Sequence, residues 1–124
     1  MPRPSRSVFK DKYLSVRIIL GGNEGYPAGT FIGLRESEWV RADPNDGIRA
    51  RLMLTSPGTP GEYAFAAVGA VVEWPGYLWM SPEFIGTELW LDDDGWLSPV
   101  RVGDHPQKVG LIVSADSAVL STMM

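Results

Sequence analysis

The chain contains no cysteine, which excludes disulfide bonds and thiolate metal sites. It has a single histidine, His105, so there is little material for a catalytic triad or a histidine-based metal centre. No apolar run approaches the about 20 residues of a membrane-spanning helix, and we expect no membrane partner. The N-terminal residues carry positive charges with no apolar segment after them, so we expect no secretory signal.

The composition of the 124 residues favours strands and turns over helices. Fourteen glycines and ten prolines are many for so short a chain, and helix interiors tolerate neither residue well. Hydrophobic residues make up 44% of the sequence, which is enough for a packed core. The length suits one domain, and we expect a single β domain over residues 13–124.

Turn signals rich in Gly, Pro, Asn and Asp recur at intervals near ten residues, as is typical of all-β sandwiches and barrels. We therefore predict an all-β fold, a single small sandwich or barrel of short antiparallel strands. At most one helical turn is expected, around Pro82–Ile85. Tyr63–Glu73 could be helical by propensity, but its valines and flanking aromatics favour a buried strand with a bulge at Gly69. The other expected strands are Leu14–Leu20, Thr30–Leu34, Glu38–Ala42, Ile48–Leu54, Gly86–Leu91, Gly95–Pro99, Lys108–Ser114 and Ser117–Ser121.

The net charge of −4 is unevenly distributed. Residues 1–12 carry four cations, at Arg3, Arg6, Lys10 and Lys12, against the single carboxylate of Asp11. We expect these residues to form a flexible basic N-terminal arm that docks on a negatively charged partner. A frayed, solvated terminus is the alternative. The rest of the chain lacks a basic patch interleaved with aromatics, so we expect no nucleic-acid partner.

Two motifs invite a chemical interpretation. His105 stands between Asp104 and Pro106, and no Gly-x-Ser-x-Gly elbow accompanies it, so we interpret it as a turn residue. We therefore expect no catalytic residue, no cofactor and no enzyme activity.

Asp92-Asp93-Asp94-Gly95 resembles part of a calcium loop. Placing Gly95 at the sixth position of an EF-hand puts Trp90 first and Arg101 last, where carboxylates are required. A hairpin turn explains this motif better, and we expect no metal, although a weak irregular calcium site stays open.

Aromatic residues are dense in one stretch of the sequence. Three interpretations are open: the rings fill the core, form an interface with a subunit or partner, or line a ligand platform. Trp74, Tyr77 and Trp79 adjoin prolines and turns and are hard to bury, so they are the predicted interface aromatics. The full set is Trp74, Tyr77, Trp79, Phe84, Trp90 and Trp96.

The order of motifs over residues 63–121 resembles small β modules of tailed-bacteriophage virions, which occur in head decoration (cement), head-fibre and tail-fibre proteins. Phe65–Val72 is an apolar stretch with an Ala-Val-Gly step, Ile85–Leu91 ends in Gly-Thr-Glu-Leu-Trp-Leu, and Asp92–Pro99 begins with an Asp-Gly turn. Gln107–Leu120 then matches a closing pair with the pattern Gln-x-Val-Gly. Trp90 stands where tyrosine is commoner in such modules, and the first 60 residues match nothing similar.

This resemblance implies an assembly role in the virion, without a cofactor and often as a homotrimer. The expected function is capsid decoration, with the major capsid protein or another virion protein as the partner. A head-fibre, tail-fibre or tail-attachment module is one alternative. A carbohydrate- or peptide-binding β module that uses Trp74, Tyr77 and Trp79 is the other.

Overall fold

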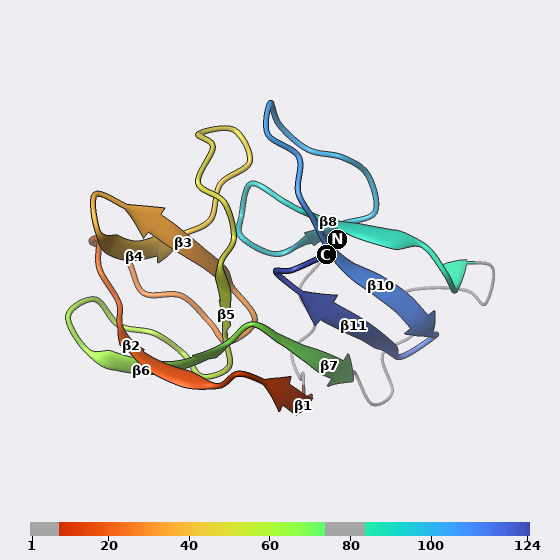
Figure 1. Ribbon diagram of the computed structural model, residues 1–124, viewed down its shortest axis with the longest axis horizontal. Coiled ribbons are helices and arrows are strands. Elements are labelled where there is room, and N and C mark those ends of the chain that lie inside the picture. Colours follow the sequence, from red (N-terminus) through yellow and green to blue (C-terminus); the bar gives the residue numbers. More distant parts are fainter. Residues whose placement is uncertain (1–7, 74–83) are drawn as a thin grey trace.

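Two antiparallel β-sheets make up the fold in the computed structural model, which describes residues 8–73 and 84–124 (Figure 1). The six-stranded sheet has the order β1-β7-β11-β10-β8-β9 and the five-stranded sheet the order β2-β6-β5-β3-β4. The prediction of an all-β fold is confirmed, as a small sandwich that does not close into a barrel. The strands are β1 (Val8–Tyr13), β2 (Val16–Ile19), β3 (Phe31–Arg35), β4 (Glu38–Arg41), β5 (Leu52–Leu54), β6 (Tyr63–Ala67), β7 (Gly69–Glu73), β8 (Glu88–Leu91), β9 (Leu97–Ser98), β10 (Lys108–Ser114) and β11 (Ser117–Ser121).

One long ribbon joins the two sheets. The segment β1–β2 runs antiparallel to the segment β6–β7. Each of these two segments contributes one strand to each sheet. At the crossing, the Val68 N–H donates to the Tyr13 carbonyl at 2.9 Å. A Cβ at Gly69 would lie 2.5 Å from the Leu120 carbonyl oxygen, which explains why glycine stands there. The predicted single strand Tyr63–Glu73 is thus two strands, interrupted at Val68, next to the expected bulge.

The larger hydrophobic core lies between the sheets. The six-stranded sheet contributes Val72, Leu89 and Ile112, and the five-stranded sheet contributes Phe31 and Met53; all are at most 2% exposed. Trp96, 1% exposed, is the largest of the fully buried side chains. Burying a large apolar side chain stabilises the folded state by roughly 1.5–3 kcal/mol. This shared core therefore holds the two sheets together.

A second core fills the concave side of the five-stranded sheet. This sheet curls until its first and last strands meet at a parallel bridge between Leu20 and Trp39. The Gly21 N–H donates to the Trp39 carbonyl at 2.8 Å. Inside the curl lie Ile18, Leu20, Ile32, Leu52, Leu54, Ala64 and Ala66.

Two polar side chains also connect the sheets. The buried Gln107, just before β10, accepts from the Ala50 N–H at 2.7 Å and donates to the Ala50 carbonyl at 3.0 Å. The Gln107 amide thus makes the two hydrogen bonds with Ala50 that a neighbouring strand would otherwise make. The expected strand Ile48–Leu54 is correspondingly shorter in the structure, where only β5 is a strand. Thr122 Oγ1 donates to the Arg51 carbonyl at 2.8 Å.

The expectations about helices have a simple outcome. No α-helix occurs in the described part of the chain, so these residues contain no helix that could span a membrane. The single turn expected around Pro82–Ile85 falls largely outside the described residues. The remaining predicted strands are found within a few residues of their expected bounds.

Candidate interaction surface

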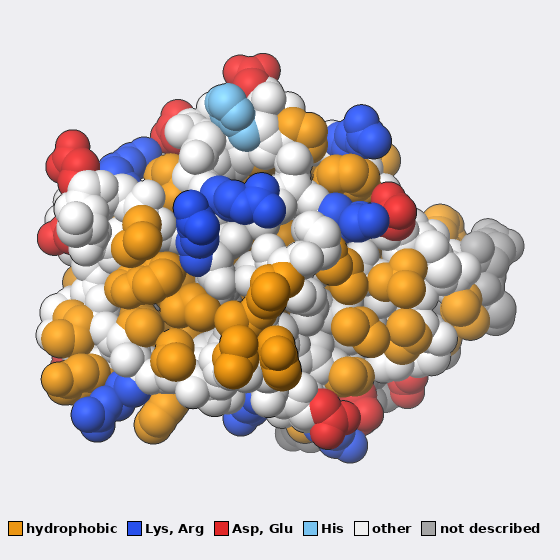
Figure 2. All heavy atoms as spheres, in the orientation of Figure 1, with side chains coloured by type: hydrophobic (Ala, Val, Ile, Leu, Met, Phe, Trp, Pro, Cys, Tyr) orange, Lys and Arg blue, Asp and Glu red, His pale blue; other side chains and the backbone are white. Residues whose placement is uncertain are grey.

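Exposed hydrophobic side chains gather on two parts of the described surface. One group lies on the outer face of the six-stranded sheet, where Leu111, Val113 and Val119 are 37%, 42% and 36% exposed. Figure 2 shows hydrophobic side chains over β10 and β11 in this region. The other group follows the β1–β2 and β6 ribbon. Because apolar patches rimmed by polar residues mark interaction sites, both surfaces are candidates.

The first surface is a row of side chains across five strands of the six-stranded sheet. Val71, Val119 and Leu111 stand opposite one another on β7, β11 and β10, and the row continues to Lys10 on one side and Glu88 on the other. We call Val71, Leu111, Val113 and Val119 the apolar strip. An ion pair lies at each end, Lys10–Glu73 at 3.0 Å and Lys108–Glu88 at 3.4 Å. The strip is therefore an apolar centre with a charged border, as in many protein interfaces.

The second surface lies on the convex side of the curled sheet. Ile19 stands opposite Tyr63, and Arg17 stands opposite Phe65, so all four side chains share one face. The two rings are 62% and 59% exposed. The Arg17 guanidinium lies 4.3 Å from the centre of the Tyr63 ring, a cation–π contact that orients both side chains. We call these four residues the ribbon patch.

A groove of about 410 Å³ adjoins the ribbon patch, where the end of β2 lies beside the start of β4. Ile19 and Gly21 line one wall, and Ser37, Glu38 and Trp39 line the other. A Cβ at Gly21 would lie 2.7 Å from the Glu38 Cβ, so the Glu38 side chain crosses close to the end of β2. The groove therefore places the Glu38 carboxylate beside Gly21, just after the end of β2.

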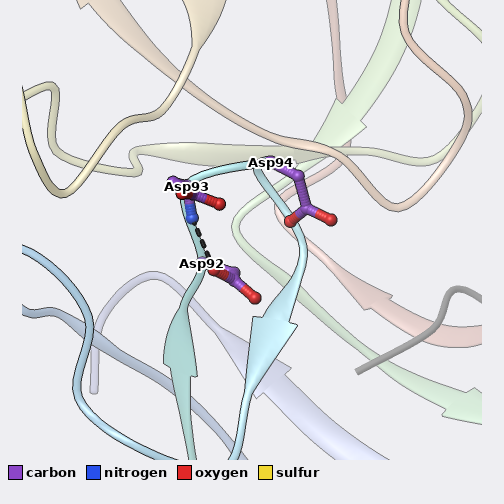
Figure 3. Close-up of side chains that lie close together, drawn as sticks. All are labelled: Asp92, Asp93 and Asp94. Atoms are coloured by element: carbon purple, nitrogen blue, oxygen red, sulfur yellow. Dashed lines mark hydrogen bonds between the residues drawn. The ribbon is translucent and has the colours of Figure 1, made fainter.

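The three consecutive aspartates lie at the tip of the β8–β9 connection (Figure 3). Their carboxylate groups lie within 4.8 Å of one another. Asp92 accepts from the Asp93 N–H at 2.8 Å, and Asp94 accepts from the Trp96 N–H at 2.9 Å. Gly95 has a φ of 77°, which suits glycine at the end of the turn. These contacts are those of a turn that joins two strands, and they point to no ligand.

His105 lies on the connection between β9 and β10. Its N–H donates to the Pro44 carbonyl at 2.9 Å, and its ring lies against Gly47. The side chain is exposed and joins Asp43 and Arg49 in lining a hollow of about 340 Å³. These contacts tie the His105 loop to the turn around Pro44 and Gly47. No serine, threonine, cysteine or lysine lines the hollow with His105.

Part of the predicted basic arm belongs to a β-strand. Lys10 and Lys12 lie in β1, which pairs with β7, so assigning residues 8–12 to a flexible arm was wrong. These residues form a strand because Phe9 packs against the larger core, while Lys10 and Lys12 face solvent. Arg3 and Arg6 lie outside the described residues.

The aromatic residues separate into different environments. Trp96 is buried in the larger core, and Trp90 is half-buried with the Arg101 guanidinium 4.8 Å from its ring centre. Phe84 is 43% exposed. The predicted interface aromatics Trp74, Tyr77 and Trp79 lie outside the described residues.

Sequence reasoning missed the ribbon patch, because Tyr63–Glu73 was interpreted as buried throughout. The alternation of Tyr63 and Phe65 with two alanines was the available signal, since it predicts a strand with one small buried face and one aromatic outer face. No protein-family model, curated protein or solved structure matches this chain.

Proposed function

We propose that the chain is a non-catalytic structural protein of a tailed-bacteriophage virion, a decoration protein that binds the outer surface of the capsid. The observation that carries the proposal is the apolar strip. Three of its four residues belong to β10 and β11, the segment whose sequence resembles the closing motif of the virion modules. An apolar strip with a charged border suits docking on a large, repeated protein surface.

The physical chemistry of decoration agrees with this role. A decoration protein must stay dissolved before it docks, and the net charge of −4 disfavours non-specific association. Many identical sites on a shell, or a homo-oligomer such as the implied trimer, multiply a modest affinity per contact. Arg3 and Arg6, with the exposed Lys10 and Lys12, add a positive contribution that suits an acidic capsid surface.

The test is cosedimentation with undecorated, expanded capsid shells of tailed phages. Leu111→Glu places a charge in the centre of the apolar strip and should weaken binding by at least about 1.4 kcal/mol, or tenfold. Val100→Glu is the matched control, because Val100 is 64% exposed and lies outside the strip. Equal binding by both variants would remove the strip from the proposal. Binding of neither the wild type nor the variants to any shell would count against decoration itself.

The contribution of the basic residues is tested separately. Removal of residues 1–7 leaves β1 intact, whereas removal of residues 1–12 would delete most of that strand. The shorter deletion should weaken attachment to capsids and make it less dependent on salt, because two arginines are lost. Unchanged attachment would exclude a docking role for Arg3 and Arg6.

A second candidate function is carbohydrate or peptide binding. The observation that favours it is the exposed pair of rings at Tyr63 and Phe65, held on one face of a strand. A glycan array and a library of extended peptides, each tested with the wild type and with Phe65→Ala, address it directly. Binding that Phe65→Ala abolishes would support this second function, and no binding to either library would oppose it.

A further inference from the structure

A third hollow, of about 280 Å³, lies where three segments of the chain converge. The segments are the stretch that follows β2, the adjacent strands β3 and β4, and the turn that follows β4. None of the described residues in its lining belongs to the apolar strip or to the ribbon patch. We call it the polar hollow, because its lining includes Asn23, Glu24, Tyr26, Arg35, Asp43 and Asp46.

Backbone hydrogen bonds hold the walls of the polar hollow in place. Tyr26 exchanges two hydrogen bonds with Gly58, at 2.9 and 2.8 Å, which fix the stretch that follows β2. Asp43 and Ile48 exchange two more, at 2.9 and 3.0 Å, which close the turn that follows β4. Since these walls are formed without a ligand, little ordering free energy is lost when a ligand binds.

The charges that line the polar hollow nearly cancel. The guanidinium groups of Arg35 and Arg41 accompany three carboxylates, those of Glu24, Asp43 and Asp46. Arg35 and Asp46 form an ion pair at 3.2 Å, which joins β3 to the turn that follows β4. The carboxylates would repel a phosphate group, and the guanidinium groups would repel a divalent cation. The lining therefore suits an uncharged ligand whose groups both donate and accept hydrogen bonds.

Tyr26 adds an apolar surface to this polar lining. Its ring is half-buried and packs against the smaller core, and it also lines the hollow. Asn23, three residues earlier, offers an amide that can both donate and accept. A sugar has an apolar C–H face and a rim of hydroxyl groups, so an aromatic ring beside donors and acceptors matches it. Small-molecule sites usually enclose about 300–1,000 Å³, so this smaller hollow favours a single sugar residue.

We propose that the polar hollow binds one residue of a neutral sugar, whose C–H face lies on Tyr26 and whose hydroxyl groups bond to Arg35 and Asp43. The Arg35 guanidinium has five N–H groups, so it keeps donors beyond its contact with Asp46. Asp43 accepts the Asn45 N–H at 2.8 Å through one oxygen, which orients the carboxylate and directs its second oxygen to other donors. The ligand is a free sugar or a sugar carried by a glycan, because both present the same face and hydroxyl groups.

Binding is measured by NMR titration of the full chain with glucose, galactose, mannose and N-acetylglucosamine. At least one of these sugars should shift the backbone amide signals of residues 23–26 and 43–48, with a Kd on the order of 1 mM. Arg35→Gln should raise this Kd at least about tenfold, because charge-assisted hydrogen bonds are lost. Arg51→Gln is the matched control, since Arg51 is exposed and lies outside the polar hollow. The rest of each spectrum reports whether the variant is folded.

Any of four results would overturn the proposal. The first is the absence of shifts with all four sugars at about 100 mM, far above the expected Kd. The second is equal weakening by Arg35→Gln and Arg51→Gln. The third is shifts at residues 23–26 and 43–48 with inorganic phosphate or calcium chloride but not with sugars, which would identify an ion site. The fourth is loss of binding in Phe65→Ala with none in Arg35→Gln, which would place the sugar on the ribbon patch.

Methyl glycosides of the sugar that binds distinguish the two sources of the ligand. If they bind as tightly as the free sugar, the anomeric oxygen points out of the hollow and a glycan can carry the ligand. If only the free sugar binds, the hollow encloses the anomeric hydroxyl and takes a soluble sugar. Arg35→Gln should leave cosedimentation with capsid shells unchanged, and Leu111→Glu should leave sugar binding unchanged. Failure of this proposal and failure of capsid docking are therefore distinguishable.

Discussion

The edges formed by β1 and β2 are consecutive in sequence and differ sharply in chemistry. β1 carries three consecutive charged residues, and its pairing with β7 is irregular between Lys10 and Tyr13. Asp11 has a φ of 49°, a left-handed conformation that interrupts the regular edge. β2 pairs regularly with β6 at all four of its residues and carries a single charge. The comparison shows that consecutive strands of one ribbon can differ on their outer sides: β1 carries charges there, whereas the end of β2 meets β4 at the Leu20–Trp39 bridge.

The largest expected effect separates the inner from the outer side of β2. Ile18→Pro removes a backbone bond to β6 and a buried side chain of the smaller core, so it should lower the free energy of unfolding by about 3 kcal/mol or more. Ile19→Pro should cost less than about 1 kcal/mol in the monomer, because its N–H faces outward. Urea denaturation at low protein concentration measures both. Equal losses would show that the assignment of outward groups on β2 is wrong.

The next largest loss of stability tests whether the two sheets unfold as one unit. Gln107→Ala leaves the N–H and C=O of Ala50 without their partners in a buried position. We expect a loss of about 2–3 kcal/mol, since each orphaned backbone group costs free energy. Differential scanning calorimetry should still show one transition, because the larger core joins both sheets. Two separate transitions would mean that each sheet is stable without the other.

The protective role of the charges on β1 is tested by removing them. Lys10→Val combined with Lys12→Val gives this edge the apolar character of β2. We expect the double variant to self-associate more than the wild type, measured by light scattering, with a change of less than about 1 kcal/mol in the free energy of unfolding of the monomer. The control is Lys108→Val, which removes a cation from an interior strand of the same sheet. If the double variant associates no more than the wild type, the irregular pairing of β1 is sufficient protection by itself.

The sequence predicted the fold class and most strands because turn residues and alternating hydrophobicity are local signals. It did not predict the break at Val68, because Tyr63–Glu73 is apolar without interruption and a change of sheet depends on long-range packing. The extent of β1 was missed for a similar reason: its many charges resemble a solvated arm until Phe9 reaches the core. The meeting of the end of β2 with β4 at the Leu20–Trp39 bridge could not be predicted, since the curl of a sheet is a property of its topology.

The smallest effect concerns the ion pair at the border between β1 and the apolar strip. Lys10→Gln removes the contact with Glu73, in which both side chains are at least 36% exposed. Because exposed ion pairs are screened, we expect a change of about 0–1 kcal/mol in the free energy of unfolding, fading as salt is raised. Chemical denaturation at low and high salt measures it, with Lys12→Gln as the control on the same strand. A larger loss that salt does not reduce would mean that Lys10 supports β1 through the packing of its aliphatic chain. The protection of that edge would then depend on shape as well as on charge.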